Sequence, residues 1–155
     1  MKAISLWQPW ASAMAVGLKR NETRHWSTDY RGELAIHAAK KPFSPGHVSQ
    51  ELVLFLWQHR IRFGQFKTIE ELFDSLPMGK IVCVLDLKNC VRSEDAINNT
   101  TQEEFMLGNY EAGRFAWLTE NYRKLDFPVP CVGRQGFFNL PPEVERQVKD
   151  QLGRI

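Results

Sequence analysis

Hydrophobic and polar positions alternate at the start of the chain and then change to a helical spacing. The alternation over Lys2–Leu6 predicts a short strand. Apolar and small residues recur every three or four positions over Gln8–Val16, which predicts a short helix with one buried face. Pro9 suits the first turn of that helix and Gly17 suits its end.

The segment after this helix is expected to be extended. A period of two would place Arg20, Glu22 and Arg24 on one face of it. A turn at residues 30–32 then leads into a predicted strand over residues 33–38.

The middle of the chain combines helical and strand patterns. An apolar stripe predicts a long amphipathic helix over residues 47–62. A second helix is predicted over residues 68–76, where Thr68 and Glu71 have the spacing of a capping box. The run of β-branched and apolar residues over 80–87 predicts a strand.

The last third is predicted to contain one long loop, two strands and a helix. Residues 91–109 are polar and irregular, which is typical of a surface loop. Residues 114–119 and 124–127 are predicted strands, and a helix is predicted from Pro141–Pro142 to about residue 152. Short strands separated by turns favour an α+β fold built on a small mixed β-barrel, with residues 1–155 forming a single domain.

Composition narrows the class of protein. The proportions of apolar residues (43%) and charged residues (25%) are those of a globular domain, and no apolar run is long enough to span a bilayer. No signal-peptide pattern follows Met1, so we expect a cytoplasmic protein without membrane partners. The cysteines, Cys83, Cys90 and Cys131, are expected to be reduced thiols rather than metal ligands or catalytic groups, because neither they nor the histidines show metal-ligand spacing. No metal and no cofactor is predicted.

Positive charge is concentrated near the start of the chain. Residues 1–41 carry seven Lys and Arg side chains and three acidic ones, a net charge of +4, whereas the whole chain carries +2 and the remainder therefore −2. Three tryptophans, Trp7, Trp10 and Trp26, are interleaved with these cations. Aromatic faces beside cations are suited to a stacked anionic ligand such as a nucleic acid.

Several spaced motifs follow one another along the chain. They are Leu6-Trp7-Gln8-Pro9-Trp10-Ala11, Gly17-x-Lys19-x-x-Glu22-x-Arg24-x-Trp26, Tyr30-Arg31-Gly32, Ile36-His37-Ala38, Gly79-Lys80-Ile81-Val82, Gly113-Arg114-Phe115-Ala116-Trp117 and Pro128-Val129-Pro130-x-x-Gly133-x-Gln135-Gly136-Phe137. Together these motifs resemble the ASCH domain family, the activating-signal-cointegrator homology domains. The resemblance covers about residues 2–140. It implies a PUA-like β-barrel with flanking helices, a cleft lined by the Gly-x-Lys-x-x-Glu-x-Arg segment, and binding of RNA or DNA.

The resemblance also raises an enzymatic alternative. Bacterial members of the family that deacetylate N(4)-acetylcytidine use a Lys-x-x-Thr pair and a separate Glu. That lysine matches Lys19, but Glu22 occupies the threonine position, with Thr23 adjacent. The separate Glu has no match anchored by a motif. The departure removes the hydroxyl from its expected face, so the activity is not transferred to this chain.

The leading hypothesis is a module that binds a single-stranded or flipped nucleotide, RNA in preference to DNA. The residues predicted to contact nucleic acid are Trp7, Gln8, Lys19, Arg24, Lys40, Lys41 and Gln135. Trp7 would stack on a base while Trp10 fills the core, and Gln8 would read a base edge or cap a turn. Arg24 would grip phosphate or pair with an acidic neighbour, and the other cations would hold phosphate.

Two other classes of function compete with this hypothesis. A hydrolase of RNA (a ribonuclease) or of a modified nucleoside would use Lys19 as acid or base, Glu22 to activate water and Thr23 as an accessory hydroxyl. The structural alternative is that Lys19 and Glu22 form a salt bridge that orders the strand. The third interpretation is a protein-interaction module that uses exposed aromatic residues. For the first two hypotheses the expected partners are RNA, DNA or a nucleoside-like small molecule.

Overall fold

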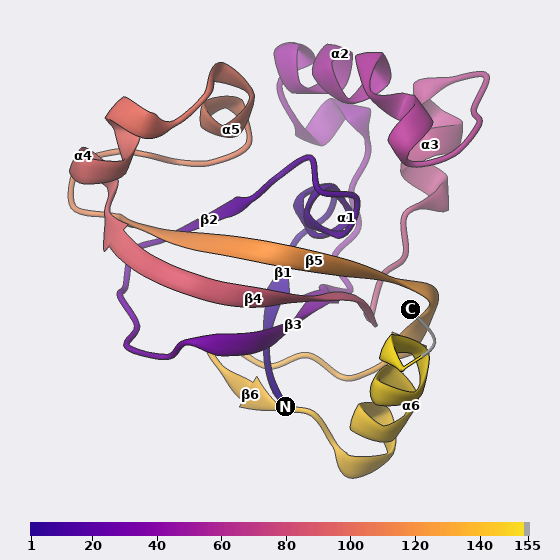
Figure 1. Ribbon diagram of the computed structural model, residues 1–155. Coiled ribbons are helices and arrows are strands. Elements are labelled where there is room, and N and C mark those ends of the chain that lie inside the picture. The colour runs from indigo at the N-terminus through magenta and orange to yellow at the C-terminus, as the bar shows by residue number, and fades with distance from the viewer. Residues whose placement is uncertain (154–155) are drawn as a thin grey trace.

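A six-stranded mixed sheet forms the centre of the computed structural model, which describes residues 1–153 (Figure 1). The strands are β1 (Lys2–Leu6), β2 (Asn21–Arg24), β3 (Gly32–Ala38), β4 (Lys80–Arg92), β5 (Phe115–Pro130) and β6 (Phe138–Asn139). Their order is β2-β5-β4-β3-β1-β6, with β1 and β3 parallel and the other neighbours antiparallel. The α+β class is thus confirmed. Within residues 1–153 the sheet does not close into the predicted small mixed β-barrel, because its edge strands β2 and β6 do not pair with each other.

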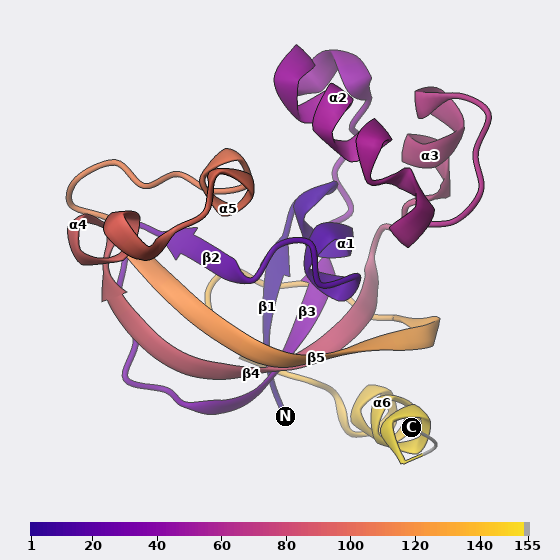
Figure 2. The same ribbon diagram turned by 45° about the horizontal axis from the view of Figure 1, so that its top comes forward.

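The sheet is strongly curved, as the bend of β4 and β5 shows in Figure 2. The register between β3 and β4 shifts once, and that between β4 and β5 shifts three times. Irregularities of this kind bend a strand and increase its twist. The curvature makes one face of the sheet concave, and α1 lies against that face (Figure 2).

Helices surround the sheet in three groups. They are α1 (Trp10–Ala15), α2 (Gln50–Gln58), α3 (Ile69–Ser75), α4 (Ser93–Ala96), α5 (Gln102–Met106) and α6 (Pro142–Leu152). Figure 1 shows α2 and α3 together beyond α1, α4 and α5 beside the end of β2, and α6 next to β5 on the other side of the sheet. Among the described residues no helix combines the length and apolar character needed to cross a bilayer.

Several sequence predictions are confirmed. The first strand, the helix α6 and the start of α3 agree with the structure, and the Thr68 side chain accepts a hydrogen bond from the Glu71 N–H at 3.2 Å. The helix predicted over residues 47–62 is wrong in length. It divides into α2 between two single 3₁₀ turns, because Ser49 caps α2 by accepting from the Leu52 N–H.

The long loop predicted over residues 91–109 is also wrong. Strand β4 continues to Arg92, and α4 and α5 follow it; Thr101 caps α5 by accepting from the Glu104 N–H at 3.2 Å. The two strands predicted at 114–119 and 124–127 are one strand, β5. Asn121 has a left-handed φ of 53° within it, so the polar stretch is an irregularity in the strand and not its end.

The core occupies both faces of the central strands. On the concave face Ile36, Leu85 and Trp117 pack with α1, and on the other face Ala35 and Val84 pack with α6. This two-sided burial explains why β3 and β4 contain apolar runs without alternation. A third cluster joins α1 to α2 and α3.

Candidate nucleic-acid interface

A cavity of about 1030 Å³ opens on the concave side of the sheet. Strand β2, the junction of β1 and α1, the end of α5 and the loop before β6 form its walls. Its lining is Ser5, Leu6, Trp7, Trp10, Glu22, Thr23, Arg24, His25, Trp26, Met106, Leu107, Gly108, Asn109, Arg114, Arg134, Gln135 and Gly136. We call this the β2 cavity.

Aromatic side chains form one side of the β2 cavity. Trp7 is 57% exposed, while Trp10 is half-buried and packs against the core, as predicted. The Lys41 ammonium lies 3.2 Å from the centroid of the Trp7 ring, a cation–π contact. Trp26 is half-buried and meets Trp117 edge to face at 4.7 Å while also lining the cavity. The cavity therefore offers one exposed aromatic ring, which Lys41 covers on one face, and two half-buried rings.

The charged residues of β2 form an ion-pair network. Glu22 Oε2 lies 3.0 Å from Arg24 Nε, and Glu22 Oε1 accepts from the Thr23 N–H at 3.1 Å. Arg24 Nη2 also donates to the Ser5 carbonyl oxygen at 2.8 Å, which ties β2 to β1. Glu22 is the single carboxylate in the lining, and Lys19 Nζ lies 3.6 Å from its Oε1. Its negative charge is thus matched by two cations.

Lys19 lies behind the cavity wall and not on its surface. The residue is 2% exposed, and its Nζ donates to the Leu107 carbonyl oxygen at 2.7 Å. Burial lowers the pKa of Lys19, while the nearby Glu22 and Glu104 carboxylates oppose that shift. A ligand in the cavity would therefore meet Lys19 through Glu22 and the Leu107 backbone.

The segment from α5 to Asn109 is fixed to β2 by polar contacts. Glu104, although nearly buried, accepts from the backbone N–H groups of Arg20 and Asn21 at 2.7 and 3.1 Å. The Thr23 hydroxyl oxygen accepts from the Asn109 N–H at 2.9 Å. These bonds make a wall of the cavity from a segment that the sequence suggested was a loose loop.

Two arginines of the cavity were not anticipated as site residues. Arg114 donates to the carbonyl oxygens of Thr23 and Asn109 at 3.1 Å each, and it follows the Gly113 of a family motif. Arg134 is exposed and lies beside Gln135. Both arginines lie within stretches that resemble the family motifs. That location is the sequence signal that could have identified them as site residues.

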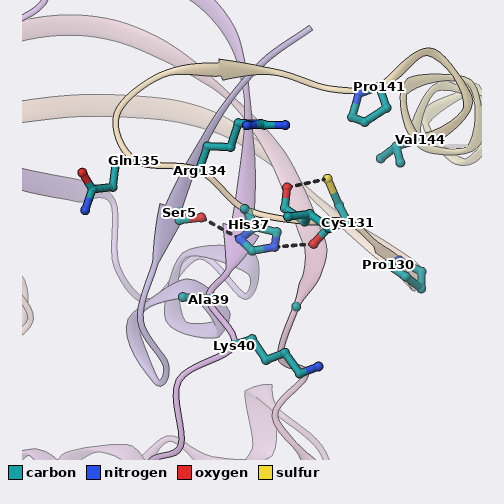
Figure 3. A pocket seen from close by; sticks show the side chains of 13 residues that line it. Ser5, His37, Ala39, Lys40, Pro130, Cys131, Arg134, Gln135, Pro141 and Val144 are labelled. Carbon is teal, nitrogen blue, oxygen red and sulfur yellow. Dashed lines mark hydrogen bonds between the residues drawn. The ribbon is translucent and has the colours of Figure 1, made fainter.

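The remaining predicted residues are dispersed. Gln8 is 2% exposed and does not line the cavity, because its amide nitrogen donates to Ser12 Oγ and the Pro77 carbonyl while its oxygen accepts from the Ser12 N–H. Lys40 lines a second cavity of about 920 Å³, shown in Figure 3. Gln135 lines both cavities. Lys41, adjacent to Lys40 in the chain, is not part of the lining of either cavity and lies over the Trp7 ring instead.

Within residues 1–153 no cluster of three or more His, Cys, Asp or Glu side chains could hold a metal ion. All three cysteines are unpaired; Cys83 is buried and Cys90 and Cys131 are half-buried. Burial raises the pKa of Cys83 to about 12, so this thiol stays protonated at neutral pH.

The family model of the ASCH domain matches residues 4–129, and the chain belongs to the ASCH domain family. Activating signal cointegrator 1 from Mus musculus and from Homo sapiens are both 29% identical to it over 150 residues. The alignment covers 96% of this chain, which spans only 24% of the length of these relatives.

Solved structures share the fold at low sequence identity. ASCH from Zymomonas mobilis gives a TM-score of 0.59 at 14% identity, covering 96% of this chain and 93% of that one. A point mutant of that protein, in which a tyrosine is replaced by phenylalanine, gives the same TM-score and identity and covers 96% of both chains. The architecture described above is therefore that of the ASCH structures.

Proposed function

We propose that the β2 cavity binds single-stranded RNA, or a nucleotide flipped from a longer RNA, in preference to DNA. The observation that supports this most directly is the composition of the cavity. It combines an exposed tryptophan with Arg24, Arg114 and Arg134, and its one carboxylate, Glu22, is already paired with cations. ASCH domains have a PUA-like fold that is associated with RNA binding, which supports the same conclusion.

Each chemical part of a nucleotide finds a complementary group here. A base would stack on the open side of Trp7, since Lys41 covers the other face of the ring. Within the described residues, Nη1 of Arg24 and Nη1 of Arg114 have no protein partner, so each can donate to phosphate. The Thr23 hydroxyl accepts from Asn109 and keeps its own hydrogen for a ligand.

The hydrolase alternative has weaker support. Both oxygens of Glu22 already accept hydrogen bonds or face cations, which is the arrangement of a structural ion pair. The observation in favour of the hydrolase is the lowered pKa of the buried Lys19, because catalytic acids and bases often have shifted pKa values. If it is correct, Glu22→Gln should lower turnover by about 100-fold.

The test is direct binding with a matched pair of tryptophan variants. Fluorescently labelled oligouridylate and its DNA counterpart would be titrated with the protein, and the products examined by mass spectrometry. Trp7→Ala should weaken RNA binding by about 1–3 kcal/mol. Trp57→Ala is the control, because Trp57 on α2 also carries a cation, Arg60 at 4.4 Å, but lies outside the β2 cavity.

The outcomes separate the functional classes. Binding without product supports an RNA-binding module, whereas turnover supports the hydrolase. Equal losses in the two tryptophan variants, or no binding by the wild type, would contradict the proposal.

A further inference from the structure

The β2 cavity and the second cavity meet at three residues. Ser5, Arg134 and Gln135 line both of them, so the two cavities adjoin at these residues. The second cavity contains Lys40 as well as Arg134, and none of the described residues that line it is Asp or Glu. Figure 3 shows these two cations on opposite sides of His37. Both cavities thus suit an anionic chain.

A row of hydrogen bonds at this junction has a fixed direction. The Cys131 carbonyl oxygen can only accept, so His37 Nε2, at 2.7 Å, must carry the hydrogen and donate it. In the neutral ring Nδ1 is then the acceptor, and it must receive its hydrogen from the Ser5 hydroxyl at 2.6 Å. Burial lowers the pKa of His37, which favours this neutral ring.

The consequence falls on Ser5. Its one hydroxyl hydrogen is committed to His37, so Ser5 Oγ can offer only lone pairs to a ligand. The group is therefore a hydrogen-bond acceptor at the junction, and it selects a ligand that donates there.

Gly133 holds this arrangement in place. A Cβ added at residue 133 would lie 2.5 Å from His37 Cε1 and 2.6 Å from Ser5 Oγ. The loop therefore packs directly on the pair, and only glycine allows that approach. The packing of Gly133 on His37 and Ser5 therefore leaves these two side chains little room to change the direction of their hydrogen bonds.

We propose that an RNA strand runs from the β2 cavity into the second cavity and that Ser5 Oγ accepts a hydrogen bond from a ribose 2′-hydroxyl at the junction. The inference rests on the proposed function. Within the sugar–phosphate backbone of an RNA strand the 2′-hydroxyl is the one hydrogen-bond donor, and DNA lacks it. Arg134, shared by the two cavities, would bind the phosphate next to that sugar.

The experiment compares three ligands of the same sequence. Oligouridylate of about six nucleotides, its 2′-fluoro analogue and its 2′-deoxy analogue would be titrated with the intact chain. Fluorine preserves the sugar pucker of RNA but cannot donate a hydrogen bond. The one donor of the uracil base, N3–H, is the same in all three ligands, so they differ only at the 2′ position. The wild type should bind RNA about fivefold more tightly than either analogue.

Ser5→Ala should bind all three ligands equally, with its affinity for RNA about fivefold below that of the wild type. Ser44→Ala is the control, since Ser44 lies outside both cavities, and it should keep the preference. The comparison of RNA with the 2′-fluoro analogue on the wild type needs no variant, so a folding defect cannot obscure it.

Two results would overturn the inference while leaving the proposed function intact. They are equal binding of RNA and the 2′-fluoro analogue by the wild type, and an unchanged preference in Ser5→Ala. Absence of binding to any of the three ligands would instead refute the proposed function, and this inference with it.

Discussion

Lys19 Nζ donates a hydrogen bond across 2.7 Å to the carbonyl oxygen of Leu107, a residue 88 positions further along the chain. The bond joins the approach to β2 with the end of α5. Because Glu104 accepts from the backbone on the same approach, α5 is fixed at two points. Lys19 therefore contributes to the site by positioning a wall of the β2 cavity.

Replacing Lys19 by methionine should destabilise that wall. The variant leaves the Leu107 carbonyl without its donor in a buried position, which costs about 1–3 kcal/mol in the free energy of unfolding. Urea denaturation measures this change, and hydrogen exchange should become faster at residues 107–109. Lys149→Met is the control, because Lys149 is exposed and its ion pair with Glu145 contributes little. Equal stability of the two variants would contradict a structural role for Lys19.

Truncation to alanine should lower the free energy of unfolding much more at Trp117 than at Trp7. Trp117 has no exposed surface, so Trp117→Ala should lower the free energy of unfolding by about 3–5 kcal/mol through the cavity it leaves. Trp7 is 57% exposed, so Trp7→Ala should retain most of the stability. Thermal denaturation of both variants is the measurement. A Trp7 variant that unfolds like the Trp117 variant would show that Trp7 packs in the core.

Local signals were sufficient for part of the fold. The capping box at Thr68 and the alternation over Lys2–Leu6 depend on neighbouring residues, and both predictions are confirmed. The joining of two predicted strands into β5 was missed because a paired neighbour decides it: β4 pairs with Glu120 before Asn121 and with Arg123 after it, with a shift of register between them. Closure of the sheet likewise depends on whether its edge strands pair, and the hydrophobic pattern along a single strand does not predict which strand is its neighbour.

The candidate site shows the same division. The pairing of Glu22 with Arg24 follows from their spacing of two, and the structure contains it. Lys19 has the Glu22 partner that the sequence offered as an alternative. Its second partner, the Leu107 carbonyl oxygen, could not be predicted, since a backbone carbonyl carries no residue-specific signal. Gln8 is a similar case. Its side-chain amide was available for a ligand as far as the sequence could show, but in the fold it makes hydrogen bonds to Ser12 and to the Pro77 carbonyl oxygen.

Stability should fall in mildly acidic solution because of His37. Burial lowers its pKa below the ordinary value of 6.5, although the hydrogen bond to the Cys131 carbonyl oxygen opposes that shift. The unfolded chain then binds more protons than the folded one below that pH. The contribution of neutral His37 to the free energy of unfolding is fully present above pH 6.5. It is lost as the pH falls towards the pKa of His37 in the folded state.

Urea denaturation between neutral pH and about pH 5 measures this dependence. The variant His37→Gln, which cannot titrate, should lose part of the slope of stability against pH. Identical slopes in the two proteins would assign the dependence to other groups, such as the exposed carboxylates.

The salt dependence of RNA binding should identify Arg134 as a phosphate contact. Arg134 is exposed and, within residues 1–153, makes no ion pair, so its full charge is available to a ligand in either cavity. For a single strand, each neutralised phosphate adds about −0.7 to the slope of log K against log salt concentration. Arg134→Gln should therefore reduce that slope by about 0.7 while leaving the free energy of unfolding unchanged.

Arg146→Gln on α6 provides the comparison for this measurement. Arg146 is also exposed, but it pairs with Glu143 and Asp150 on its own helix and lines neither cavity. A general effect of net charge would change the slope equally in the two variants, because each loses one positive charge. A change confined to Arg134→Gln would instead place a phosphate at the junction of the cavities, whereas equal slopes in both would remove Arg134 from the binding surface.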